Sequence, residues 1–225
     1  DPSIDYIDGD YASATDINND GYIDMIARKR GTNAYDLYYN DPENPSNFTR
    51  KVDIQDANND NKGAVSFFDL DNDGDFDLIW TAASETKIYE QLENGDFVEV
   101  LQPFVIANSL EFIDGLAGGD IDNDGDIDLF FGDDTGSSYL LINETPIGGE
   151  ITFTIENRGI DVQADAEGAD FVDFDQDGDL DLYININGSH NQLWVNNLED
   201  NKQENDDYLY VKILENRDIQ AQANS

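Results

Sequence analysis

The sequence predicts an all-β chain made of four repeats, each a four-stranded antiparallel sheet. A nine-residue acidic motif begins at Asp16, Asp69, Asp120 and Asp173, so the repeat is about 52 residues long. Short runs rich in Ile, Val, Leu, Phe and Tyr separate the motifs, and Gly, Asn and Asp bound these runs, as is typical of strands and turns. No stretch has a convincing helical period. Four strands in every repeat are the pattern of a β-propeller blade.

We expect the acidic motif of each repeat to form the turn between its first two strands. The second repeat illustrates the order, with strands predicted over 63–70, 76–82, 87–92 and 97–101. The same pattern predicts strands over 22–27, 35–39 and 48–52 in the first repeat, 127–132, 139–142 and 151–155 in the third, and 180–186, 192–195 and 208–214 in the fourth. The repeats then extend over about 10–62, 63–114, 115–166 and 167–217. Together they form one propeller domain or propeller fragment over 1–217, followed by a tail or linker over 218–225.

The start of the chain resembles a later segment. Residues 3–9 read SIDYIDG and residues 109–115 read SLEFIDG. Each of these two segments immediately precedes one of the repeats. The chain therefore opens as though an earlier unit had just ended. Two explanations stay open: a further blade lies upstream, or residues 1–9 supply a strand that closes the propeller.

The acidic motif itself predicts a metal site. Residues 120–128 read DIDNDGDID, and so many carboxylates cannot lie together without a compensating positive charge. Their spacing suits a hard divalent cation with oxygen ligands, and Ca²⁺ is the usual one. Counting from Asp120 as position one, we expect side chains at positions one, three, five and nine to bind the ion. Position seven would contribute its backbone carbonyl with its own side chain in water, and Gly125 at position six permits the sharp turn.

The same count gives the metal-binding positions of all four repeats. They are Asp16, Asn18, Asp20, Tyr22 and Asp24 in the first; Asp69, Asp71, Asp73, Asp75 and Asp77 in the second; Asp120, Asp122, Asp124, Asp126 and Asp128 in the third; and Asp173, Asp175, Asp177, Asp179 and Asp181 in the fourth. About four Ca²⁺ ions are therefore expected, with a structural role. The first site should bind most weakly, because Asn18 replaces one carboxylate.

An EF-hand is the main alternative for these loops, and the sequence argues against it. An EF-hand needs Glu at position twelve. The residues at position twelve are Ala27, Trp80, Phe131 and Ile184, and they lie in β-like runs. The Asp at position nine must therefore complete the site, and we expect it to do so with both oxygens. A solvated acidic turn without metal is disfavoured because the motif occurs four times in register.

The repeated Asp-x-Asp-x-Asp-Gly-Asp-x-Asp-Leu pattern resembles the FG-GAP and VCBS repeats of integrin α-type propellers and of many secreted bacterial proteins. The resemblance extends over about residues 10–214, with Phe131-Gly132 keeping the Phe-Gly pair and 63–65 and 168–170 corresponding to the Gly-Ala-Pro piece. It implies calcium loops between the first two strands of each blade. Residues 208–218 also resemble weakly the start of the ASPIC/UnbV module, which would then lend the last blade its outer strand.

Composition limits the partners and the chemistry. The chain has 51 acidic and 11 basic residues and a formal net charge of −40, which makes nucleic acid and anionic membranes poor partners because they carry charge of the same sign. There is no cysteine, so disulfides, zinc thiolates and cysteine nucleophiles are excluded. His190 is the single histidine and lies in a polar turn, so no acid–base set is visible. No apolar run is long enough for a membrane helix.

The expected function is that of a non-enzymatic, extracellular, calcium-binding propeller module for adhesion or for binding a protein or glycan. Asp-based sites of this kind often need calcium above cytosolic levels, which favours a secreted or cell-surface location. An alternative is a structural subunit of an extracellular filament or surface layer, because open blade arrays expose strand edges that can pair between copies. A polysaccharide-active enzyme is the third and weakest hypothesis. We expect no catalytic residues and no cofactor other than Ca²⁺.

Overall fold

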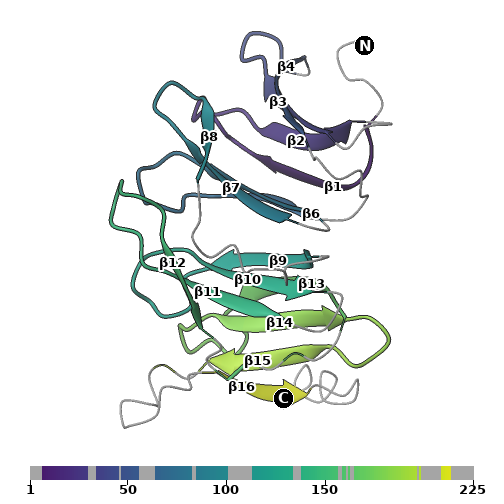
Figure 1. Cartoon of the computed structure of the whole chain (residues 1–225), viewed down its shortest axis with the longest axis vertical. Helices are drawn as coiled ribbons and strands as arrows, with labels where there is room; N and C mark the ends of the chain where they lie inside the picture. Colours follow the sequence, from purple (N-terminus) through teal and green to yellow (C-terminus); the bar gives the residue numbers. More distant parts are fainter. Residues whose placement is uncertain are drawn as a thin grey trace. The chain divides into compact units, whose positions relative to one another are not determined.

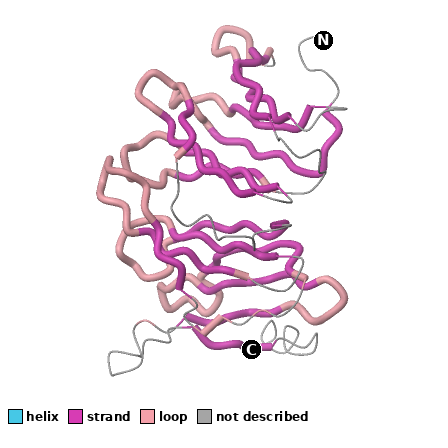
Figure 2. The backbone as a smooth tube through the Cα atoms, in the orientation of Figure 1, coloured by secondary structure: helices cyan, strands magenta, loops and turns pink. Residues whose placement is uncertain are grey.

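The computed structural model describes residues 7–29, 34–45, 47–55, 64–82, 85–100, 113–133, 138–156, 159–160, 162, 165–196, 198 and 209–213. All regular secondary structure in these ranges is β-strand, as Figure 2 shows. The predicted all-β class is confirmed. The ranges contain no helix long and apolar enough to cross a membrane.

The strands form four separate sheets, one for each repeat (Figure 1). In sequence order they are β1 (Ile7–Thr15), β2 (Asp24–Lys29), β3 (Ala34–Asn40) and β4 (Phe48–Gln55); β5 (Val65–Phe68), β6 (Asp77–Ala82), β7 (Glu85–Gln91) and β8 (Phe97–Glu99); β9 (Ile113–Gly119), β10 (Asp128–Asp133), β11 (Tyr139–Asn143) and β12 (Phe153–Glu156); and β13 (Ala166–Val172), β14 (Asp181–Ile186), β15 (Gln192–Asn196) and β16 (Leu209–Ile213). Each strand pairs antiparallel with its neighbour in the sequence, so every sheet is a four-stranded meander of the blade type.

The chain divides into two compact units. Residues 1–112 with 146–151 form the first unit, and 113–145 with 152–225 form the second. Each unit contains two of the sheets, and their first strands lie next to each other: β1 lies beside β5 in the first unit, and β9 lies beside β13 in the second. Figure 1 labels the second pair.

The second strands explain why these sheets pack face to face. β10 is buried along its whole length, and Leu129, Phe130 and Phe131 are inaccessible to solvent. Because side chains alternate between the two faces of a strand, one side of β10 faces the other sheet of its unit. Phe130, at loop position eleven, lies on that side. Phe130 accordingly packs in one core cluster with Leu182 and Ile184 of the fourth repeat.

β9 carries small residues because β13 of the neighbouring sheet approaches it closely. A Cβ atom on Gly119 would lie 2.9 Å from the Leu180 Cδ1 atom and 3.1 Å from the Phe171 Cβ atom. A side chain at this position of β9 would therefore push the third and fourth sheets apart.

The predicted strands agree with the observed ones to within a few residues, and one interpretation changes. Residues 7–9 and 113–115 lie in β1 and β9, the first strands of the repeats that follow them. They are therefore not the end of an earlier unit. Both pairings contain a register shift near this point, at Ile7/Ala12 and at Gly132/Asp133. The residues before Ile7, and 109–112, lie outside the described residues.

Candidate metal centres

The four acidic motifs form the turns between the first and second strands, as predicted, and they share one backbone conformation. At position six, φ is 90° for Gly21, 97° for Gly74, 98° for Gly125 and 99° for Gly178. These values require glycine, because side chains with a Cβ atom rarely adopt them. Position four is also left-handed, with φ between 56° and 65°, and is occupied by Asn19, Asn72, Asn123 and Gln176. Asparagine tolerates this conformation better than most residues.

In the first three loops, hydrogen bonds from backbone N–H groups hold the carboxylates toward the centre of the loop. In the second repeat the N–H of Gly74 donates to Asp69 Oδ2 at 3.1 Å and the N–H of Asp75 donates to Asp73 Oδ1 at 2.8 Å. The N–H of Asp73 donates to both Asp69 and Asp71 at 3.2 Å. The first repeat has the same set, with Asn18 Oδ1 in place of the third-position carboxylate. The loop is thus pre-shaped by its own backbone.

The Asp at position nine has a second role that the sequence did not predict. Asp128 is buried, and its Oδ2 accepts the N–H of Ile121 at 2.9 Å while its Oδ1 accepts the N–H of Asn143 at 2.8 Å. The first bond closes the loop, and the second fastens the loop to the end of β11. Equivalent pairs of bonds are made by Asp24, Asp77 and Asp181. The position-nine side chain, at the start of the second strand, therefore joins the acidic loop to the end of the third strand of its sheet.

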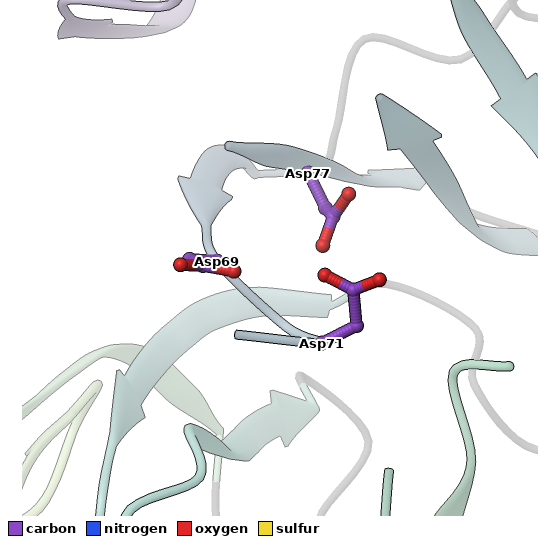
Figure 3. Close-up of side chains that lie close together, drawn as sticks. All are labelled: Asp69, Asp71 and Asp77. Atoms are coloured by element: carbon purple, nitrogen blue, oxygen red, sulfur yellow. The ribbon is translucent and has the colours of Figure 1, made fainter. Parts of the chain in front are cut away.

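Three of the loops bring carboxylate oxygens close enough to share one cation. The oxygens of Asp69, Asp71 and Asp77 all lie within 4.8 Å of one another, as do those of Asp120, Asp122 and Asp128 and those of Asp173, Asp175 and Asp177. Figure 3 shows the carboxylates of Asp71 and Asp77 facing one another, with Asp69 beside them. These clusters combine the predicted positions one, three, five and nine. The first repeat is not among them in the described residues, in keeping with Asn18 at position three.

The donor set fits a hard cation. All side-chain donors in the three clusters are carboxylate oxygens, which Ca²⁺ prefers. Asp173 Oδ1 is buried and has no hydrogen-bond partner among the described residues, a costly arrangement unless a ligand neutralises it. The residues that would hold the ion are those at positions one, three, five and nine, with the position-seven carbonyl as a predicted further ligand. A bound cation would offset the mutual repulsion of the carboxylates.

Burial raises the pKa of the central carboxyls. Desolvation is the main cause for Asp77 and Asp128, whose pKa values rise to about 7 although two backbone N–H donors oppose the shift in each case. Nearby carboxylates raise both pKa values further. Desolvation and Asp73 likewise raise the pKa of Asp71 to about 6. Each loop therefore holds carboxyl groups that bind protons unusually well when no cation is present.

In the calcium-free chain we expect stability to increase as the pH falls from 7.5 to 5. Asp77 and Asp128 keep a proton up to about pH 7 in the folded chain but release it near the ordinary value of 3.8 once unfolded. Between these values the folded state binds more protons, so the free energy of unfolding decreases as the pH rises. Thermal melts of calcium-depleted protein should show a melting temperature about 5 °C or more higher at pH 5. The increase should be smaller in Asp77→Asn, and a decrease on acidification would contradict the expectation.

Hydrogen bonds also connect the loops of successive repeats. In the first unit Asn19 Nδ2 donates to Gly74 O at 3.1 Å and to Asp75 Oδ1 at 3.2 Å. In the second unit Asn123 Nδ2 donates to Asp179 Oδ1 at 2.7 Å, and Asp179 is buried. Position four of one loop thus contacts position seven of the next. For Asp179 the expectation of a side chain in water is wrong, because the preceding loop covers and binds its carboxylate.

Replacing Asn123 should destabilise the second unit. Asn123→Gly keeps the left-handed backbone but leaves the buried Asp179 carboxylate without this donor, which should cost about 2 kcal/mol of unfolding free energy. A double-mutant cycle of Asn123→Gly and Asp179→Ala measured by denaturant unfolding isolates the pair. A coupling energy near zero would show that the bond does not connect the two loops.

The third strands carry a further set of residues that sequence reasoning missed. Each ends in an amide residue: Asn40, Gln91, Asn143 and Asn196. Gln91 Nε2 donates to Ile17 O of the first repeat at 3.1 Å, and Asn196 Nδ2 donates to Ile121 O of the third repeat at 2.7 Å. Gln91 and Asn196 thus fasten the second and fourth repeats to the loops of the first and third, whereas Asn40 and Asn143 donate to Ile23 O and Ile127 O of their own repeats. An amide residue recurs at a nearly constant number of residues after each acidic motif, and this recurrence could have identified the set from the sequence.

Three overlapping segments of the chain match one known protein family. A family model for the FG-GAP-like repeat matches residues 16–80, 69–131 and 120–184. Each match begins at position one of an acidic loop and ends in the second strand of the next repeat. No curated protein matches the chain. A similar solved structure is the Tc holotoxin pore of Photorhabdus luminescens, at 18% identity and a TM-score of 0.39, with 82% of this chain and 8% of that chain covered. The chain thus spans a small part of the length of that protein.

Proposed function

Because the chain belongs to the FG-GAP-like repeat family, we propose that it is an extracellular binding module whose acidic loops hold structural Ca²⁺ ions. The single observation that carries the proposal is the grouping of three carboxylates within 4.8 Å in three consecutive loops. FG-GAP repeats are typical of extracellular proteins, where calcium is abundant enough for sites of moderate affinity.

Calcium fits these loops better than magnesium. The predicted site offers four carboxylates and one backbone carbonyl from a single nine-residue turn, and Ca²⁺ accepts six to eight oxygen ligands in variable geometry. Mg²⁺ demands a stricter octahedron and keeps several waters, so it would use fewer of these oxygens. The glycine at position six and the left-handed residue at position four fix the turn around one centre.

The ion in this proposal is structural, and the ligand of the module binds elsewhere. The position-nine carboxylates are buried and joined to the backbone of their own sheets, so they are poorly placed to meet a partner. A net charge of −40 favours a neutral glycan or a protein with a cationic surface as the partner. We propose no catalytic role, because His190, the single histidine of the sequence, is exposed in a polar turn.

The proposal is tested by binding to arrays of glycans and extracellular matrix proteins. Labelled protein is applied in 2 mM Ca²⁺ and again after chelation, with Asp124→Ala as a variant that impairs one site. We expect binding that depends on calcium and weakens in the variant. The absence of binding to any glycan or protein in calcium would count against a binding module.

A further inference from the structure

A buried chain of hydrogen bonds connects the two acidic loops of the second unit. It begins at Asp128, the position-nine carboxylate of the third repeat, whose Oδ2 accepts the N–H of Ile121 at 2.9 Å. The carbonyl of Ile121 accepts a hydrogen bond from Asn196 Nδ2 at 2.7 Å. The backbone N–H of Asn196 donates in turn to Oδ1 of Asp181, at position nine of the fourth repeat, at 2.8 Å. Two residues, Ile121 and Asn196, thus connect predicted metal ligands of two different repeats.

The first unit contains the same chain of hydrogen bonds, built with a longer amide side chain. Asp24 Oδ2 accepts the N–H of Ile17 at 3.1 Å, and the carbonyl of Ile17 accepts Gln91 Nε2 at 3.1 Å. The backbone N–H of Gln91 donates to Asp77 Oδ1 at 3.0 Å. We call Gln91 and Asn196 the bridging amides. Their equivalent contacts indicate that the connection belongs to the pairing of two repeats and not to one particular side chain.

Every residue of these two chains of hydrogen bonds is buried, so water does not compete for the contacts. The buried residues are Asp24, Ile17, Gln91 and Asp77 in the first unit and Asp128, Ile121, Asn196 and Asp181 in the second. Hydrogen bonds to charged carboxylates are stronger than neutral ones, and a low local dielectric strengthens them further. The oxygen atom of each bridging amide has no hydrogen-bond partner among the described residues, which costs free energy. The contacts made by the N–H groups of these amides must offset that cost.

An ion in one loop would fix the groups on which the neighbouring loop depends. Ile121 is at position two, between the predicted ligands Asp120 and Asp122. Without an ion the carboxylates around it repel one another, and with an ion they are drawn toward one centre. The second state fixes the direction of the Ile121 carbonyl and therefore the position of Asn196. Because the backbone of Asn196 holds Asp181, the first ion orders a ligand of the second site.

We propose that the two calcium loops of each unit bind their ions cooperatively, coupled through the bridging amide between them. The proposal rests on the proposed function, because it requires that the loops hold Ca²⁺, and it adds a regulation of those sites. The first ion bears the ordering cost of the shared groups, so the second ion binds more tightly. The coupling is reciprocal, because each ion must change the affinity for the other by the same factor.

Repulsion between the two ions opposes this coupling but is the weaker effect. The third and fourth loops each contain five Asp residues, so a loop stays negative after one Ca²⁺ binds. Salt screens exposed charges beyond about 8 Å at 0.15 M. The bond from Asn123 to Asp179, at the edge of the same two loops, adds a second connection. We therefore expect a net positive coupling at physiological salt.

The experiment is a calcium titration of the isotopically labelled whole chain, followed by NMR with one amide resonance for each loop. The position-six glycine reports its own loop, because the N–H of Gly125 donates to Asp120 at 3.0 Å and the N–H of Gly74 makes the same bond in the second repeat. Asp175→Ala impairs the fourth site, since Asp175 is an exposed position-three residue outside the chain of hydrogen bonds. Gly125 then gives the Kd of the third loop with and without its neighbour, and Gly74 is the control in the first unit.

We expect Asp175→Ala to raise the calcium Kd measured at Gly125 about fivefold or more and to leave the Kd at Gly74 unchanged. When Asn196→Ala has removed the bridging side chain, adding Asp175→Ala should raise the Kd at Gly125 only about twofold or less. Asn196→Gln should restore the full coupling, because Gln91 is the bridging amide of the first unit. Comparing the unmodified chain with Asp175→Ala decides the question even if Asn196→Ala does not fold.

The outcomes separate this proposal from the proposed function. If calcium shifts none of the glycine resonances, the metal sites themselves are wrong. If calcium binds but Asp175→Ala leaves the Kd at Gly125 unchanged, the sites stand and the coupling is overturned. The same rise in Kd with and without the Asn196 side chain would overturn the route through the bridging amide. An equal rise at Gly74 would overturn the proposal as well, because the effect would then not belong to one unit.

Discussion

Removing calcium is expected to lower the melting temperature of this chain by roughly 15–30 °C. A ligand at a hundredfold excess over its Kd stabilises the folded state by about 2.7 kcal/mol per site, and three clusters are well formed. In a chain of this size each kcal/mol shifts the melting temperature by roughly 2–4 °C. The effect should be this large because the loops depend on the ion to offset the repulsion among carboxylates held at each centre.

The measurement is a thermal melt followed by circular dichroism in 2 mM Ca²⁺, in excess chelator, and after calcium is restored. The melting temperature should recover fully on restoration, and 2 mM Mg²⁺ should recover only part of it. Identical melts with and without chelator would mean that the loops are solvated acidic turns.

Replacing Asp128 is expected to destabilise the chain even when no calcium is present. Both of its carboxylate oxygens accept backbone N–H groups, from Ile121 and from Asn143, in a buried setting. Asp128→Ala leaves two buried donors without their acceptor, and each should cost about 1–3 kcal/mol, so the total is about 4 kcal/mol. The site of the third repeat should be lost as well.

The contrast with position five makes this prediction specific. Asp124 is exposed, and Asp124→Ala should impair the same metal site. In chelator, however, Asp124→Ala should melt at or slightly above the unmodified chain, because it removes one repelling charge. Asp128→Asn should fall between the two variants, because the amide keeps one acceptor oxygen. Equal melting temperatures of Asp128→Ala and Asp124→Ala in chelator would contradict the structural role assigned to position nine.

Most of the fold could be predicted because the same sequence pattern recurs in all four repeats. The motif spacing, the apolar runs and the turn residues together placed the loops and nearly all strands. The start of β1 was misread because residues 7–9 precede a register shift, and a bulged strand does not keep a simple alternating pattern.

The site could be predicted only as far as it is local in the sequence. Positions one, three and five lie within one turn, so their spacing alone indicates a shared cation. The bond from Asn143 to Asp128 joins residues 15 positions apart and depends on the pairing of β10 with β11. The contact between Asn123 and Asp179 spans 56 positions and depends on how two sheets pack. Neither register nor packing can be derived from the motif itself.

The central claim is that each acidic loop is a calcium site, and native mass spectrometry of the chain tests it most directly by counting bound ions. With calcium raised stepwise, we expect three ions to bind first, in the loops of the second, third and fourth repeats, and a fourth to bind only at higher concentration, in the loop with Asn18. Asp124→Ala should reduce the count by one. A chain that binds no ion in millimolar calcium, or binds ions without saturation, would contradict the account.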